Sequence, residues 1–119
     1  MSETNFNLED RTFRFAQAVR AYCKNVTHHT INVQDIKQVV RSSGSVAANY
    51  IEANEALSKA DFIYRIKVCR KEAKETVLWI NLIGIEDKPE LAVTKLQLAD
   101  EAKQLMLIFN AIIKKTNAN

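Results

Sequence analysis

Two pairs of glutamates, each separated by three positions, have a spacing that could place metal ligands on one face of a helix in a bundle. They are Glu52 with Glu55 and Glu72 with Glu75. Carboxylate-bridged two-metal centres in four-helix bundles combine a Glu-x-x-His pair on each of two helices with single glutamates on the others. The two histidines, His28 and His29, are adjacent in a segment without helical periodicity, so they do not complete such a ligand set. We predict no metal site and expect the glutamates to form solvated or interhelical ion pairs, such as Glu75 with Lys71.

Side chains that could act as nucleophiles are present, but without partners at a useful spacing. A serine or cysteine nucleophile needs a base and a group that orients the base. Ser42, Ser43 and Ser45 lie in a run of small residues that suits helix packing, and Cys23 and Cys69 are far apart and are expected in the core. The chain also has no glycine-rich phosphate loop. We therefore predict no catalytic residues and no cofactor, and we do not expect an enzyme.

Basic side chains gather in one segment. Residues 58–84 hold six Lys or Arg and three Asp or Glu, which accounts for the whole formal net charge of +3. Steps of three and four residues place most of the cations along one flank of a helix, where they could follow nucleic-acid phosphates. The candidate binding residues are Arg65, Lys67, Arg70, Lys71 and Lys74. The alternative is a solvated helix face that is partly neutralised by Glu72 and Glu75.

Four stretches with helical periodicity must position these side chains. The chain has 119 residues, two glycines and one proline, which favours long helices over a fold with many turns. Apolar residues recur at steps of three and four over residues 8–26, 33–57, 59–83 and 90–115. Short connections make neighbouring helices antiparallel. We predict an all-α fold, a single domain of residues 1–119 that forms an antiparallel up-down four-helix bundle.

The apolar stripes and helix ends can be assigned in more detail. We expect Gly44 to lie inside a continuous second helix because a neighbouring backbone comes close, a break there being the lesser possibility. Ser58 should cap the third helix, Gly84 should end it in a left-handed conformation, and Pro89 should open the fourth. The predicted buried stripes are Leu8, Phe15, Val19, Tyr22 and Val26; Ile36, Val40, Ser43, Ala47, Tyr50, Asn54 and Leu57; Phe62, Ile66, Cys69, Ala73, Thr76, Ile80 and Ile83; and Leu91, Leu98, Ala102, Leu105, Phe109 and Ile112, widened by Leu96, Ala99, Met106 and Ile113.

More apolar residues are present than one bundle needs for its core. A bundle helix requires about three apolar positions in seven. The surplus side chains are Phe6, Phe13, Val68, Trp79, Leu82, Leu107 and Ile108. We expect them to form a contiguous exposed patch through which copies of the chain associate as a homo-oligomer.

Two segments carry a resemblance to a known family. Residues 41–53 (RSSGSVAANYIEA) and 61–76 (DFIYRIKVCRKEAKET), followed by Trp79, resemble the four-helix-bundle proteins encoded within intervening sequences of bacterial large-subunit ribosomal RNA genes, which are sometimes labelled ribosomal proteins. The resemblance spans nearly the whole chain and implies a continuous second helix and a ring of five subunits with a central channel. A related accessory protein of diversity-generating retroelements uses a basic surface to engage nucleic acid and a reverse transcriptase. The family offers no catalytic residues to transfer.

These observations predict a non-enzymatic, pentameric homo-oligomer that binds RNA or DNA through the third helix. The alternative is a protein-interaction scaffold that receives a partner protein on Val68, Trp79 and Leu82, with charges that serve only solubility. The N-terminal residues include no apolar leader, and no apolar run approaches the roughly 18 residues that a bilayer requires. We therefore expect a cytoplasmic protein with no membrane association.

Overall fold

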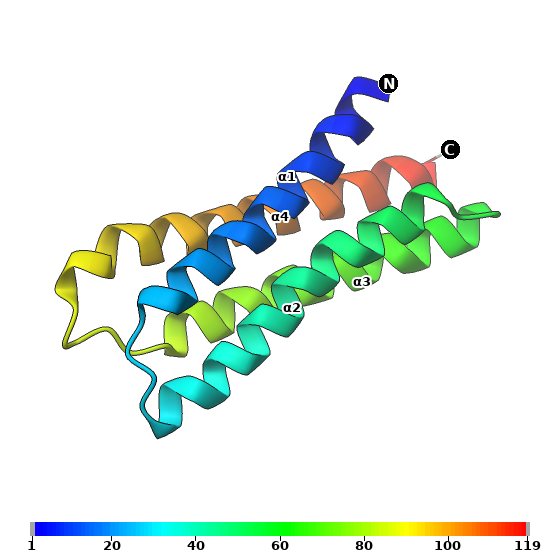
Figure 1. Cartoon of the computed structure of the whole chain (residues 1–119). Coiled ribbons are helices and arrows are strands. Elements are labelled where there is room, and N and C mark those ends of the chain that lie inside the picture. Colours follow the sequence, from blue (N-terminus) through cyan, green and yellow to red (C-terminus); the bar gives the residue numbers. More distant parts are fainter. Residues whose placement is uncertain (1, 119) are drawn as a thin grey trace.

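The computed structural model describes residues 2–118, and it describes the side chains of residues 8–118. The described residues form α1 (Ser2–Asn25), α2 (Thr30–Asn54), α3 (Lys59–Leu82), a short 3-10 helix η1 (Pro89–Leu91) and α4 (Ala92–Ala118), with no strand among them. Figure 1 shows the four long helices packed lengthwise. The prediction of an all-α four-helix bundle is confirmed. The helix ends differ from the predicted ones by a few residues, except that α1 begins well before residue 8.

Contacts between helices show that neighbours along the chain run antiparallel. Ser42 meets Thr76 while Val46 meets Cys69, so α2 and α3 run in opposite directions. Arg70, in the middle of α3, meets Asn110 near the end of α4, and Lys95 near the start of α4 reaches Ile83 just past the end of α3. The interfaces of α3 with α2 and with α4 are the most extensive, whereas α1 and α4 touch little. The long axis of the bundle extends 50 Å.

The core follows the predicted stripes on three helices. All five residues of the first predicted stripe are buried, although Val26 lies just past the end of α1. The third stripe is buried from Ile66 to Ile83, which lies just past the end of α3, and Phe62 is partly buried. On α4 the main stripe is buried from Leu98 to Phe109, but Leu96, predicted to widen it, is exposed. The four helices share one cluster of buried side chains, and in it the ring of Phe109 lies 6.2 Å from that of Tyr50.

The predicted stripe of α2 is correct at Ser43 and Tyr50, which are buried, but is shifted by about one residue at Val40, Ala47 and Asn54. The buried positions are Asn32, Val39, Ser42, Ser43, Val46, Tyr50 and Ala53. Asn54 and Leu57 were expected inside, yet both are exposed, because the helix ends at Asn54 and turns toward α3. In the middle of α2, small residues occupy both the predicted stripe and the one that is buried. The hydrophobic pattern there therefore does not discriminate between these two stripes, which differ by one residue, or a rotation of the helix by about 100°.

Gly44 lies inside a continuous α2, as predicted, but the reason differs from the expected one. The neighbour is a side chain of α1 and not a backbone. A Cβ atom on Gly44 would lie 3.1 Å from Nη2 of Arg20, and the same nitrogen donates to the carbonyl oxygen of Val40 at 3.3 Å. The glycine thus leaves room for a guanidinium that joins α1 to α2.

The helix ends are held partly by side chains that sequence patterns did not reveal. The Ser58 hydroxyl accepts from the backbone N–H of Asp61 at 3.0 Å, which confirms the predicted cap. The left-handed cap at Gly84 is wrong, since no glycine has a positive φ among residues 2–118. Asn32 of α2 binds the backbone after the end of α3 instead. Its Oδ1 accepts from Gly84 N and its Nδ2 donates to Gly84 O, both at 2.9 Å. His29 caps α2 by accepting from Asn32 N.

Candidate nucleic-acid interface

Three lysines form a stripe along the exposed face of α3. Lys67, Lys71 and Lys74 follow one another at steps of four and three, and all three are exposed. Tyr64 and Leu78 continue the same stripe at its two ends and are 59% and 50% exposed. We call Lys67, Lys71 and Lys74 the lysine strip. The sequence prediction therefore placed three of its five basic residues on one face.

The other two candidates, Arg65 and Arg70, are half-buried and tied to neighbouring helices. Nη1 of Arg65 donates to Oδ1 of Asn49 on α2 at 3.1 Å. Nη1 of Arg70 donates to Oδ1 of Asn110 on α4 at 2.9 Å. Because both arginines flank the lysine strip, they add positive potential there while also joining helices.

The two glutamates of α3 form no ion pair with the lysine strip. Arg41 of α2 binds both, with its Nη2 at 3.2 Å from Glu72 and 3.3 Å from Glu75. The expected pair between Lys71 and Glu75 is therefore wrong. The sequence spacing suggested a partner for Glu75 one turn away on its own helix. Arg41 of α2 lies within reach instead, because it also binds Glu72, which is buried at the α2–α3 interface. Among the side chains of residues 8–118, the lysine strip has no ion-pair partner.

A groove between α3 and α4 runs beside the lysine strip. It has a volume of about 450 Å³ and is lined by Arg70, Lys71, Lys74, Met106, Leu107 and Asn110. The α3 side is cationic, whereas Met106 and Leu107 make the α4 side apolar. The bond from Arg70 fixes the amide of Asn110 between them. This combination suits a ligand that carries both negative charge and apolar surface.

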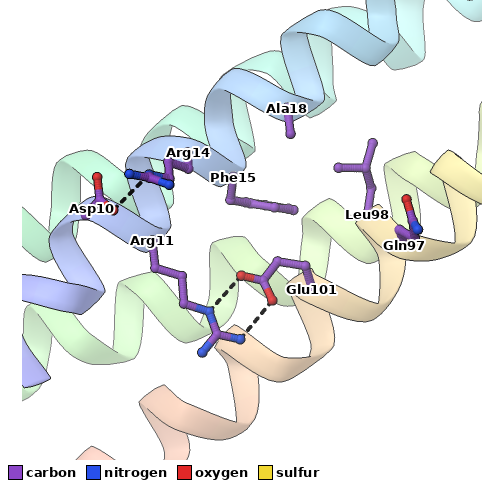
Figure 2. A pocket seen from close by; sticks show the side chains of 8 residues that line it. All are labelled: Asp10, Arg11, Arg14, Phe15, Ala18, Gln97, Leu98 and Glu101. Carbon is purple, nitrogen blue, oxygen red and sulfur yellow. Dashed lines mark hydrogen bonds and ion pairs between the residues drawn. The ribbon is translucent and has the colours of Figure 1, made fainter.

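A larger cavity of about 680 Å³ lies between α1 and α4 (Figure 2). Arg11 donates two hydrogen bonds to Glu101, at 2.7 and 2.8 Å, and Arg14 pairs with Asp10 at 2.8 Å. The bond to Glu101 raises the pKa of Arg11. Since the four charges neutralise one another, this cavity offers a ligand no unpaired charge. No sequence signal pairs Arg11 with a residue on the last helix, because the two are distant in the chain.

The glutamates considered as metal ligands are not brought together. Glu72 and Glu75 bind Arg41, whereas Glu52 on α2 and Glu55 just past its end are exposed. Within residues 8–118, no group of three or more His, Cys, Asp or Glu side chains could hold a metal ion. The histidines have local roles: His29 caps α2, and Nε2 of His28 lies 2.9 Å from the carbonyl oxygen of Cys23.

The serines considered as nucleophiles take part in helix packing. The Ser42 hydroxyl lies 2.7 Å from that of Thr76, and both residues are fully buried between α2 and α3. The Ser43 hydroxyl donates to the carbonyl oxygen of Val40 within its own helix. Ser45 accepts from the amide of Asn49, also on α2. The small side chains let α2 and α3 approach closely, as expected for this run.

Both cysteines are buried and reduced. Burial raises the pKa of Cys23 to about 11 and that of Cys69 to about 12. Because the thiolate is the reactive form, we expect neither thiol to react with a disulfide reagent within minutes at pH 8 in the native protein, and both to react in denaturant. Colorimetric titration of released thiolate measures this. Rapid reaction of the native protein would contradict the burial of these side chains.

The same shifts determine how stability changes at high pH. Unfolded thiols ionise near their ordinary pKa of 9.0, whereas the folded chain retains its protons up to about pH 11 or 12. Their contribution to stability is fully present below pH 9 and is lost as the pH rises through the folded values. Chemical denaturation between pH 8 and 11 should therefore show a falling free energy of unfolding, and a constant value would contradict it.

The predicted interface residues lie on several faces. Phe13 and Ile51 line a hollow between α1 and α2, whereas Leu107 lines the groove between α3 and α4. Leu82 is 52% exposed near the end of α3, and Val68 is half-buried. Trp79 and Ile108 are partly buried against the core, and Phe6 lies outside the residues whose side chains are described. Phe13 and Leu107 thus line separate hollows, and an oligomer interface formed by these residues stays a prediction.

No helix among the described residues combines the length and the apolar character needed to cross a membrane.

Comparison with known proteins assigns the chain to a family. A search of curated proteins finds no match. Among solved structures, the chain is similar to a protein of unknown function from the S23 ribosomal protein family of Bacteroides thetaiotaomicron, with 28% sequence identity and a TM-score of 0.76. The likeness covers 92% of this chain and 97% of that one. The model of the 23S rRNA-intervening sequence protein family matches residues 4–114. The family resemblance in residues 41–79 is thus confirmed, and the chain belongs to the 23S rRNA-intervening sequence protein family.

Proposed function

We propose that this protein is a non-enzymatic homo-oligomer that acts in the cytoplasm and binds the phosphates of RNA or DNA along the lysine strip of α3. The observation that carries the proposal is the pairing of Arg41 with Glu72 and Glu75. It directs both carboxylates toward α2 and offsets one of their two charges, so the strip presents three cations that have no ion-pair partner among the described side chains. Arg65 and Arg70 flank them. The ribosomal names of the family and of the similar structure also favour an RNA partner.

The energetics of phosphate binding give the proposal a measurable signature. Each phosphate that a lysine neutralises releases counterions, and the logarithm of the binding constant falls by about 0.7 to 0.9 per contact for each tenfold rise in salt. Three lysines per subunit make a weak site. Repetition of the strip in an oligomer would raise the apparent affinity without new contacts, because the second strip binds within the same complex.

Charge reversal tests the lysine strip. The double substitution Lys71→Glu with Lys74→Glu should weaken binding of a labelled RNA or DNA strand at least tenfold and reduce the salt slope by about 2. Fluorescence anisotropy over a range of salt concentrations measures both quantities. The matched control is Lys24→Glu with Lys37→Glu, which makes the same change in net charge at exposed positions on α1 and α2.

The control variant should bind within about twofold of the natural protein. Equal losses in the two variants would show that overall charge, and not the lysine strip, governs binding. A protein that binds no nucleic acid at low salt overturns the proposal and leaves the protein-interaction scaffold as the better alternative.

We further propose that the chain assembles as a ring of five subunits, as the family resemblance implies. Exposed apolar side chains on unlike faces support this, because a contact between two different faces generates a ring when the rotation closes. Phe13 lies between α1 and α2, Leu82 near the end of α3, and Val93 and Leu96 at the start of α4; each is at least half-exposed.

Light scattering on the purified protein tests the assembly. The expected mass is near five times the 13.5 kDa of one chain. A mass near that of one chain in dilute solution would overturn the assembly proposal, while the binding measurement above tests the lysine strip separately.

A further inference from the structure

An exposed aromatic ring stands at one end of the lysine strip. Tyr64 lies one turn before Lys67 on the same face of α3, and 59% of its surface is exposed. An isolated exposed apolar side chain needs no explanation. This ring, however, is oriented by an interaction with a neighbouring side chain.

The guanidinium of Arg65 lies over the ring of Tyr64, 5.6 Å from its centroid. The same guanidinium donates to Oδ1 of Asn49 on α2 at 3.1 Å, so it cannot rotate away without losing that bond. A cation above an aromatic face is attracted to the ring's negative potential. The ring is thereby held against the bundle on one side, while most of its surface remains open to solvent.

The spacing matches a short piece of nucleic acid. Ten residues separate Tyr64 from Lys74, which corresponds to about 15 Å along the helix axis. At the rise of about 3.4 Å per nucleotide of a helical, stacked strand, this length covers about four nucleotides, and a more extended single strand covers fewer. The bases of a duplex are stacked and paired, so their faces are not available to a ring on a protein surface, whereas an unpaired base can stack on it.

The groove beside the lysine strip favours the same kind of ligand. Leu107 and Met106 lie opposite Lys71 and Lys74. The outer surface of a duplex presents charged phosphates, which gain nothing from an apolar wall. A single strand can direct its phosphates toward the lysines and its sugars and bases toward the apolar side.

We propose that the lysine strip binds single-stranded nucleic acid, with the ring of Tyr64 as the platform on which an unpaired base stacks beside the phosphates held by Lys67 and Lys71. This deepens the proposed function and rests on it. Stacking on an aromatic ring accepts any base, so the site discriminates unpaired from paired strands and does not read sequence.

The test compares one labelled strand of about 20 nucleotides, as RNA and as DNA, with the same strand annealed to its complement. Tyr64→Ala should weaken single-strand binding about tenfold for both sugars and leave duplex binding within about twofold, because stacking acts only on unpaired bases. Tyr64→Phe should retain single-strand affinity. Ile31→Ala, which removes a 70% exposed apolar side chain at the start of α2, away from the lysine strip and from the side chains proposed for assembly, should have no effect.

Three outcomes overturn the inference. They are a Tyr64→Ala variant with unchanged single-strand affinity, equal losses on single strand and duplex, and a natural protein that prefers the duplex. If duplex binding still depends on Lys71 and Lys74 in any of these cases, the proposed function stands and only the single-strand inference fails. A natural protein that binds neither probe overturns both.

Discussion

Replacing Asn32 with alanine is expected to lower the free energy of unfolding by about 3 kcal/mol. Asn32 is 1% exposed, and its amide donates to the carbonyl oxygens of Thr27 at 3.0 Å and Gly84 at 2.9 Å. Its Oδ1 also accepts from Gly84 N. Alanine would leave these backbone groups without partners in a poorly hydrated corner, where each costs about 1–3 kcal/mol. Denaturation in urea, followed by circular dichroism, measures the loss.

The control for this prediction is Asn81→Ala. Asn81 is exposed near the end of α3, close in sequence to the corner that Asn32 binds. Its replacement should change stability by no more than about 0.5 kcal/mol. A loss below about 1 kcal/mol for Asn32→Ala would show that the link between the α1–α2 connection and the end of α3 contributes little.

Truncation of Phe109 to alanine should cost about 3–5 kcal/mol. Phe109 of α4 is fully buried and packs against Tyr50 of α2, so its ring joins two helices across the centre of the bundle. Removing the ring loses the free energy gained by its burial and leaves a cavity that rigid helices cannot close completely. Thermal unfolding should show a midpoint lower by about 10–20 °C for a domain of this length.

Leu107→Ala provides the comparison on the same helix. Leu107 is 58% exposed, so its truncation should cost at most about 1 kcal/mol. If the two variants lost equal stability, the side chain of Leu107 would be buried in the folded assembly, and the groove between α3 and α4 would be an interface between subunits. The pair of variants therefore also reports on the surface proposed for nucleic acid.

Arg41 links the stability of the bundle to the proposed function. The sequence allowed interhelical ion pairs for the α3 carboxylates, but its spacing suggested Lys71 as the partner of Glu75 and a helix face partly neutralised by both glutamates. In the structure the carboxylates bind across the α2–α3 interface, and the lysines remain unpaired. The same residues thus give either a neutralised helix face or a cationic one, depending on a contact from another helix.

The sequence by itself determined the number of helices, the buried stripes of α1 and α3, and the Ser58 cap, because each depends on residues within a few positions of one another. Periodicity of apolar residues and local hydrogen-bond partners are encoded over one or two turns. The lysine strip was also visible at this level, since Lys67, Lys71 and Lys74 belong to one helix face.

Only the tertiary structure decided the register of α2 and the contact between the Arg20 guanidinium and Gly44. It also decided the hydrogen bonds of Asn32 to Gly84 and the pairing of Arg41 with Glu72 and Glu75. Each depends on how one helix is rotated and shifted along its neighbour. Small residues and long flexible side chains tolerate several such arrangements, so the hydrophobic pattern does not select among them. Packing of the whole core selects one, and with it the charges that remain unpaired at the surface.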